Sequence, residues 1–525
     1  MASALLVDAT DIAAWANRRE SQGVLPKLVR RLVHATCQRV AHAGFRAGEG
    51  VQLGGWDGIV EVEQGNAFVP NGLSVWELST EKHARGKADD DYAKRLRDPL
   101  GVDPSRATFV FVTARRWKAK GTWAAERDEE GRWSKVRAYD ADDLEAWLES
   151  ASAVHIWLSV ALGKHPEGAE DVDNYWDGWS SVTRPAMSPE LVLAGREKIL
   201  ERIRGVWAAD PSVLTLRGES RPEALAVLAA CLRTLAIDKR EDLLSRTVIA
   251  GDLAAWKRLI ASSEQLILIQ NFESAETTGP ALKKGHTPVV LLGRADSASS
   301  NVIEIPRVSR EETVKALVAM GVPSDRAGDL AGVARSSLIR LRRMLSVVPE
   351  IERPIWARPE HARSLLPALL LGRWSADMEG DRGVLATIAG TTYDAVNTNV
   401  VRWSNEDDPP VRCTGTKWHL ASEEDAWSLL GRHLTRDDLD RFHNVAIDVL
   451  NRPDPSFELP DDRRWMAGVL GKRPRHSNML RAGIANTLAV IGARGDSIQI
   501  TGGVTIGGYA GACVRKILED AGWKV

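Results

Sequence analysis

The stretch GGWDGIVEVEQGNAFVPNGLSVWELSTEK, residues 54–82, contains two carboxylates whose spacing could bind a metal ion. Its β-rich halves are bounded by Gly, Pro and Asn, which predicts a short antiparallel pair of strands. Because side chains alternate along a strand, Asp57 and Glu77 are expected side by side at one edge of the sheet. Two carboxylates repel each other there unless a cation lies between them, and Mg²⁺ prefers oxygen ligands of this kind.

The chemistry expected of such a site is hydrolysis of a phosphate ester. A bound Mg²⁺ would polarise a phosphate, orient a water molecule and stabilise the leaving oxygen. A lysine beside the metal would lower the pKa of that water and offset charge in the transition state. Lys82 and Lys87 both follow Glu77 closely in the chain. The alternative is that these carboxylates are ordinary surface groups of a β-rich domain.

Basic residues occur in two groups that could flank this site. Three lie on one predicted helix and four follow a predicted buried strand: Lys27, Arg30 and Arg31, and Arg115, Arg116, Lys118 and Lys120. Side chains of this type neutralise backbone phosphates and position nucleic acid, so they predict a DNA-binding surface. A solvated face with no such role is the alternative.

A second candidate site lies at VLTLRGESRPEALAVLAACL (213–232), where strand, Gly turn and helix follow one another. A working phosphate-binding loop needs glycines, a Lys for the β and γ oxygens and a Ser or Thr for Mg²⁺. Only Gly218 and Ser220 meet these needs, and the next apolar strand ends in Gln270 and Asn271 instead of acidic residues. We expect no nucleotide hydrolysis. Binding through backbone donors stays open.

Composition sets the context of both sites. The chain has 525 residues, 44% of them hydrophobic, and a formal net charge of −2, so any DNA-binding surface must be local. The four cysteines have neither metal-binding nor disulfide-like spacing, which fits a reducing compartment. The first residues lack a secretion signal and no apolar run is long enough to span a bilayer. We therefore expect a cytoplasmic protein.

The pattern of helices and strands expected around these residues predicts a multidomain α/β protein. Amphipathic spacing predicts a helix over 24–44, and the charged segment 87–99 is predicted to form a second helix. The continuous apolar run at 107–115 predicts a buried strand. Strands that alternate with helices predict a parallel sheet in the middle of the chain. The expected parts are an α/β domain (1–163), a polar linker (164–189), a parallel α/β domain (190–308), a helical lid (309–350), a winged-helix-like unit (351–455) and a C-terminal helical region (456–525).

The order helix, strands, helix, strand, together with GWDG (55–58) and SVWE (74–77), resembles the PD-(D/E)xK restriction-endonuclease-like nucleases. More narrowly, residues 20–160 resemble the nuclease domains at the front of large bacterial anti-phage defence proteins. The resemblance implies that Asp57 and Glu77 are the motif carboxylates that bind Mg²⁺ and that DNA is cleaved. The family's lysine usually lies two residues after the glutamate, where this chain has Ser79. Lys82 or Lys87 would then supply the lysine, or it is absent.

With the helical lid and the winged-helix-like unit, residues 190–450 resemble the P-loop signalling NTPases called STAND proteins, without their catalytic residues. The two resemblances together imply a Mg²⁺-dependent DNA endonuclease effector regulated by a degenerate NTPase-like module. They imply DNA and a phage-derived trigger or partner protein as partners, with no membrane, and leave self-association open. The alternative is a non-catalytic scaffold or DNA-binding regulator whose nuclease and NTPase sites have decayed.

The last predicted helices carry apolar faces. NMLRAGIANTLAVIGARGD (478–496) and ACVRKILEDAGWKV (512–525) have helical spacing, and the sequence ends two residues after Trp523. Stacked helical pairs bury a continuous core only when several units adjoin, and a terminal unit normally has a polar cap. We therefore expect either the front part of a longer protein or a protomer whose final helices a partner covers.

Overall fold

The computed structural model describes residues 6–46, 55–208, 210–273, 277–297, 301–348, 351, 353–451, 455–467, 469–472, 474–494, 499–500 and 504–505. The protein is a multidomain α/β protein, and its chain divides into two compact units. Among the described residues, the first unit runs to Val182, continues through Ala186–Leu292 and ends at Glu312. The second unit contains Thr183–Pro185, Gly293–Ser297 and the chain from Thr313 onwards.

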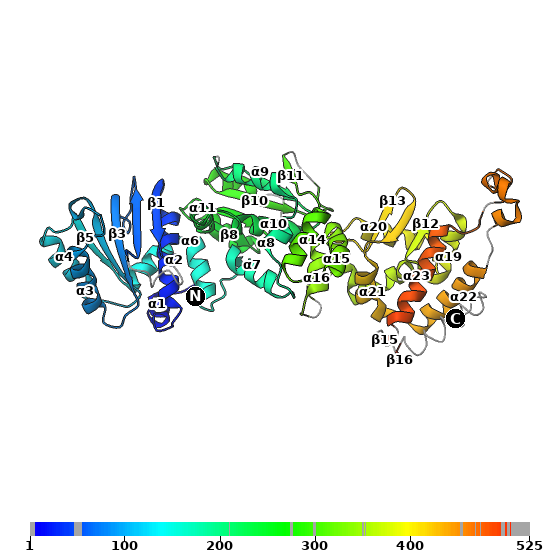
Figure 1. The fold of residues 1–525 in the computed structure, drawn as a ribbon, viewed down its shortest axis with the longest axis horizontal. Helices are drawn as coiled ribbons and strands as arrows, with labels where there is room; N and C mark the ends of the chain where they lie inside the picture. Colours follow the sequence, from blue (N-terminus) through cyan, green and yellow to red (C-terminus); the bar gives the residue numbers. More distant parts are fainter. Residues whose placement is uncertain are drawn as a thin grey trace. The chain divides into compact units, whose positions relative to one another are not determined.

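The first unit begins with a mixed five-stranded sheet (Figure 1). Its strands, which follow one another in sequence order, are β1 (Val40–Phe45), β2 (Gly58–Val62), β3 (Gly72–Ser79), β4 (Thr108–Thr113) and β5 (Lys135–Tyr139). The pairs β1–β2 and β2–β3 are antiparallel, whereas β3–β4 and β4–β5 are parallel. Every residue of β4 is buried, which explains its continuous apolar run.

Helices cover both faces of this sheet, and each face has its own core (Figure 1). One face carries α1 (Ala9–Trp15), α2 (Ser21–Thr36), α5 (Ala141–Glu149) and α6 (Ser152–Ala161). The other face carries α3 (Ala84–Arg97) and α4 (Lys120–Glu129), with the short 3₁₀ helix η3 (Pro104–Arg106) leading into β4. Alternation along β4 places Val110 in the first core and Phe109 in the second.

The helix predicted over 24–44 is shorter than expected. It ends at Thr36, and β1 begins at Val40. Arg39 has a φ of 54°, a left-handed conformation that turns the chain between the two elements. The residues of β1 gain backbone pairing with β2, and this tertiary pairing overrides their local helical spacing.

The second sheet of the first unit has six strands in the order β11-β7-β10-β9-β8-β6. They are β6 (Ala169–Glu170), β7 (Leu214–Arg217), β8 (Thr247–Ala250), β9 (Ile267–Gln270), β10 (Thr287–Leu292) and β11 (Val302–Glu304). All adjacent pairs are parallel except β6–β8, so the predicted parallel sheet is confirmed. Its helices are α7 (Val172–Ser181), α8 (Pro189–Val192), α9 (Glu197–Ala208), α10 (Arg221–Arg233), α11 (Ile237–Leu244), α12 (Leu253–Ile260) and α13 (Thr278–Lys283).

The segment 164–189 differs from the polar linker expected there. It contributes β6 to the edge of the second sheet and forms α7. Asp171 caps α7 by accepting hydrogen bonds from the backbone N–H groups of its first turn. Trp176 and Trp179 are buried, and burial of two large side chains fixes the segment against the unit.

The second unit is largely helical. It contains α14 (Arg310–Ala319), α15 (Ser324–Ser336), α16 (Leu338–Leu345), η4 (Ile355–Ala357), α17 (Pro359–Ala362), η5 (Arg363–Leu365), α18 (Leu366–Leu371), α19 (Glu379–Ala389), α20 (Tyr393–Ser404), α21 (Glu423–Leu430), η6 (Gly431–His433), α22 (Arg436–Asn451), η7 (Pro455–Glu458), η8 (Asp461–Met466) and α23 (Asn478–Arg494). A small antiparallel sheet joins β12 (Arg373–Ser375), β14 (Lys417–Leu420) and β13 (Val411–Thr414), and β15 (Gln499–Ile500) pairs with β16 (Val504–Thr505).

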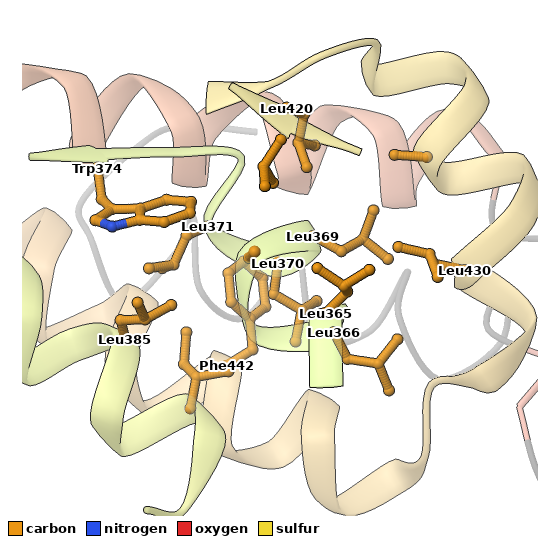
Figure 2. Packing of buried hydrophobic residues seen from close by; sticks show 14 of the residues in the cluster. Leu365, Leu366, Leu369, Leu370, Leu371, Trp374, Leu385, Leu420, Leu430 and Phe442 are labelled. Carbon is orange, nitrogen blue, oxygen red and sulfur yellow. The ribbon is translucent and has the colours of Figure 1, made fainter. Parts of the chain in front are cut away.

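The core of the second unit forms around α18. Figure 2 shows the leucines of this short helix with Trp374, Leu385 and Phe442 on one side and Leu430 on the other, side chains that come from β12, α19, α22 and α21. Every residue of this helix is apolar, so the helix can be buried on all sides. The helices and the hairpin β13–β14 thus share one core.

The apolar face of α23 packs within its own unit, whereas the expectation for the final helices together stays a prediction. Leu480, Ile484 and Leu488 recur every four residues and are buried in the same core as α18. Residues 512–525, the other predicted helix, lie outside the described residues. Within the described part of the chain, no helix combines the length and apolar character needed to cross a bilayer.

Candidate active site

Asp57 and Glu77 meet where β2 and β3 pair. Gly58 lies opposite Trp76 and the strands are antiparallel, so the residue before Gly58 is beside the residue after Trp76. The Oδ2 atom of Asp57 accepts a 2.8 Å hydrogen bond from the backbone N–H of Leu78, which fixes its carboxylate beside β3. The structure therefore brings together the two carboxylates that the sequence pattern placed side by side.

Helix α3 adds three charged side chains to this pair. Lys87, Asp91 and Arg95 follow at four-residue intervals, which places them on one face of the helix. The Nζ atom of Lys87 lies 2.7 Å from Oδ1 of Asp91, and Nε of Arg95 donates to Oε1 of Glu77. We call Asp57, Glu77, Asp91, Lys87 and Arg95 the carboxylate cluster.

The charges of the cluster shift the pKa of its members. Burial and the neighbouring charge of Asp57 raise the pKa of Glu77 to about 8. Burial also raises the pKa of Asp57, against the hydrogen bonds it makes with Leu78 and Glu77. Burial opposes the charge on Lys87, but its hydrogen bond to Asp91 holds its pKa above the ordinary value. Without a further cation, the carboxyl of Glu77 therefore keeps its proton at neutral pH, and Lys87 is charged.

Arg95 is the fixed cation of the cluster. Its side chain is 3% exposed, and its guanidinium lies 4.6 Å from the centre of the Trp56 ring. It also donates to the backbone carbonyl of Gly55, directly before that ring. Arg95 therefore offsets the charge of Glu77 while it engages only one of the two carboxylate oxygens.

The donor set fits a small divalent cation that retains water molecules. Oδ2 of Asp91 is buried and has no hydrogen-bond partner among the described residues, an arrangement that normally costs free energy. Over the described part of the chain, no three His, Cys, Asp or Glu side chains are arranged to bind one metal ion. Asp57 and Glu77 would therefore be the protein ligands, and water and phosphate oxygens would complete the octahedral shell of Mg²⁺.

The raised pKa of Glu77 predicts that the stability of the first unit falls as pH rises. The folded protein keeps a proton on Glu77 that the unfolded chain releases near the ordinary pKa of 4.5. Between that value and about 8 the folded state binds more protons, so the free energy of unfolding decreases with pH. In the presence of EDTA we expect Glu77 to account for a loss of about 2–4 kcal/mol across this window.

Calorimetric unfolding of wild type and Glu77→Gln at several pH values measures this loss. The glutamine can still accept a hydrogen bond from Arg95 but does not titrate, so the variant should lose this part of the pH dependence. Glu63→Gln is the matched control, because the side chain of Glu63 is 66% exposed, and it should follow wild type. Parallel curves for wild type and Glu77→Gln would contradict the prediction.

Of the two candidate lysines, the structure places only Lys87 in the carboxylate cluster. Lys82 is exposed in the turn between β3 and α3. Ser79 occupies the position two residues after the glutamate, and its hydroxyl accepts a hydrogen bond from the backbone N–H of Glu81 at 3.1 Å. A lysine that acts with Asp57 therefore has to come from the helix.

Asp91 and Arg95 were not predicted as site residues. Their signal in the sequence is the spacing of Lys87, Asp91 and Arg95 in KADDDYAKR, which repeats every four residues. That spacing shows that the three share a helix face. It does not show that the face lies against Glu77, because the packing of α3 on the sheet is a tertiary contact.

The first group of predicted DNA-binding residues is committed to contacts within the protein. Arg31 is 1% exposed, and it pairs with Glu241 at 2.7 Å and with Asp173 at 2.5 Å. Lys27 pairs with Asp173 at 3.1 Å, and Arg30 is buried and donates to a backbone carbonyl of β1. The expectation of a phosphate-binding surface is therefore wrong for Arg30 and Arg31, because both side chains are buried and their guanidinium groups already pair with acidic residues or a backbone carbonyl.

The second group of predicted DNA-binding residues contains both side chains engaged within the protein and side chains exposed to solvent. Arg115 donates to main-chain carbonyls of neighbouring segments, and Lys120 pairs with two carboxylates at the start of α5. Arg116 pairs with Asp142 at 3.0 Å, and more than half of each side chain is exposed. Lys118 is also exposed. Arg116 and Lys118 are thus the members of this group that can reach a phosphate in solvent.

The turn between β7 and α10 is arranged as a helix cap. Ser220 accepts a 3.3 Å hydrogen bond from the backbone N–H of Glu223, so its hydroxyl caps α10. The carboxylate of Glu223 is buried in the first turn of α10, where it pairs with Arg196. A buried acid at this end of the helix opposes a phosphate that would approach by way of Gly218. Weak or absent nucleotide hydrolysis at this turn stays a prediction.

Compared with known proteins, the sequence matches no model of a protein family and no curated protein.

Proposed function

We propose that residues 1–163 form a Mg²⁺-dependent DNA endonuclease domain, the effector of a bacterial anti-phage defence protein regulated by the degenerate NTPase-like module behind it. The observation that supports the proposal is the position of Asp57 beside Glu77 at the β2–β3 pair, next to helix α3, which contacts Glu77 through Arg95 and carries Lys87 held by Asp91. The resemblance of GWDG and SVWE to the PD-(D/E)xK nucleases supplies the substrate class.

The residues of the cluster have separate tasks in this proposal. When bound, Mg²⁺ would polarise a phosphate and lower the pKa of a water molecule on it. Asp57 and Glu77 would hold the ion after Glu77 releases its proton. Lys87 would stabilise the negative charge that develops on the phosphate in the transition state, and Asp91 positions its ammonium group. Arg95 keeps the carboxylate of Glu77 in place.

Cleavage of supercoiled plasmid in the presence of Mg²⁺ or Mn²⁺ tests the proposal. We expect wild type to nick the plasmid and Asp57→Asn to lose at least about 10²-fold in rate, because the substitution removes the charge of a metal ligand. Asp90→Asn changes an exposed carboxylate on the same helix α3 and should behave as wild type. Calorimetric titration with Mn²⁺ gives a second readout, since Asp57→Asn should weaken binding even if a trigger controls cleavage.

The second candidate function is a non-catalytic scaffold or DNA-binding regulator. It is favoured by Arg95, which already neutralises Glu77, and by Ser79 at the usual position of the lysine. The same experiments decide between the two functions. Absence of both cleavage and Mn²⁺ binding in wild type, or equal values for wild type and Asp57→Asn, would favour the scaffold.

A further inference from the structure

The carboxylate cluster contains a cation that the chain holds in place by three contacts. The guanidinium of Arg95 donates to Oε1 of Glu77 and to the backbone carbonyl of Gly55, and it lies 4.6 Å from the centre of the Trp56 ring. The side chains of Arg95 and Glu77 are only 3% and 5% exposed. Because guanidinium groups stay protonated in proteins, a permanent positive charge is fixed beside Glu77.

The charges of the cluster nearly cancel before any metal ion is added. Asp57, Glu77 and Asp91 are balanced by Lys87 and Arg95, so the five side chains carry one net negative charge when all are ionised. Mg²⁺ would change this to one net positive charge at a partly buried site, where water and salt screen charges less than at the surface. Among the described residues, no three His, Cys, Asp or Glu side chains are arranged to hold one ion. The missing negative charge therefore has to come from another molecule.

A backbone phosphate of DNA has the two properties that the cluster lacks. It carries one negative charge, and its oxygens are ligands that Mg²⁺ accepts readily. A metal ion that binds together with this phosphate brings the net charge of the site to zero. The metal ion and the DNA should therefore each bind more tightly in the presence of the other, and by the same factor.

We propose that Arg95 makes metal binding at the carboxylate cluster depend on DNA. Its fixed charge keeps the affinity for Mg²⁺ low in the free protein, and a backbone phosphate compensates for that charge when DNA is bound. The proposal rests on the proposed function, since it takes Asp57 and Glu77 as the metal ligands and DNA as the substrate. Arg95 sets the metal affinity of the site and takes no part in the reaction.

Equilibrium binding of Mn²⁺ to the full chain, measured from the paramagnetic resonance of the free ion, tests the dependence on DNA. We expect wild type to bind Mn²⁺ at least about tenfold more tightly with a short phosphorothioate duplex, whose linkages are cleaved slowly, than without it. Asp57→Asn with the same duplex corrects for Mn²⁺ that the DNA binds by itself. Equal affinity of wild type with and without the duplex would overturn the proposal.

Variants of Arg95 test its part in this dependence. Without DNA, Arg95→Met should bind Mn²⁺ at least about tenfold more tightly than wild type, because the change removes a unit charge close to a divalent ion. A proton competes for the same carboxylates, but it gains less from the change because it carries half the charge of Mn²⁺. Arg95→Lys keeps the charge and should bind as wild type does. Lys94→Met removes an exposed cation from the same helix α3 and should not change binding.

The possible outcomes separate this proposal from the proposed function. Tighter binding by Arg95→Met cannot result from a damaged fold, which would weaken the site. If that variant does not fold, the comparison of wild type with and without DNA still decides. An affinity of folded Arg95→Met equal to or below that of wild type, or the same change in Arg95→Lys, would overturn the proposal and leave the metal site intact. Absence of Mn²⁺ binding in every protein, with and without DNA, would refute the metal site itself and both proposals with it.

Discussion

Replacement of Lys87 by methionine should reduce Mg²⁺-dependent DNA cleavage about 10²–10³-fold, whereas the same change at Lys82 should leave it unaltered. The loss is large because a fixed cation beside the metal stabilises charge that exists only in the transition state. Lys87 is held in this position by Asp91 at 2.7 Å, and its ammonium remains partly accessible, with 39% of the side chain exposed. Lys82 is exposed and outside the cluster.

Initial rates of plasmid nicking for the two variants measure this difference. Lys87→Met leaves the buried carboxylate of Asp91 without its cation, so part of a loss could arise from destabilisation. The double variant Lys87→Met with Asp91→Asn removes that charge and should regain stability without regaining activity. Mn²⁺ binding should survive in Lys87→Met, because the lysine is no metal ligand. Loss of cleavage in Lys82→Met but not in Lys87→Met would overturn the assignment.

Replacement of Arg31 by methionine should destabilise the first unit by about 3–5 kcal/mol. Arg31 lies on α2 beside the first sheet, and its partners Asp173 and Glu241 lie on α7 and α11 beside the second. Burial alone would raise the pKa of Asp173, but Arg31 and Lys27 hold it well below its usual range. Removal of the guanidinium would leave the buried carboxylate of Glu241 without its main cation, which is the costly case for a buried ion pair. The partly buried Asp173 would keep Lys27 and Arg233.

Lys27→Met is the matched control, because Lys27 also pairs with Asp173 but is one-third exposed. It should cost no more than about 1 kcal/mol, as is usual for solvated pairs. A triple variant that combines Arg31→Met with Asp173→Asn and Glu241→Gln should recover much of the stability. Chemical denaturation of all three, followed by circular dichroism, measures these differences. Equal losses for Arg31→Met and Lys27→Met would show that Arg31 is not the centre of the network.

The sequence by itself determined the features that depend on local spacing. The β-rich segments predicted Asp57 beside Glu77, which the structure places directly before β2 and within β3, and the continuous apolar run at 107–115 predicted a buried strand. Alternation of strands and helices predicted the parallel sheet of the second half of the first unit. Such patterns are visible in one sequence because each is set by residues only a few positions apart.

Only the tertiary structure decided which side chains are buried or paired by residues far away in the sequence. The spacing of Lys27, Arg30 and Arg31 is that of a solvated basic helix, yet Arg31 is buried by acids that lie 142 and 210 residues further along the chain. Asp91 and Arg95 likewise join the carboxylate cluster because α3 packs against the sheet face that carries Glu77. Ion pairs of this kind depend on which helix faces meet, and no local periodicity records that choice.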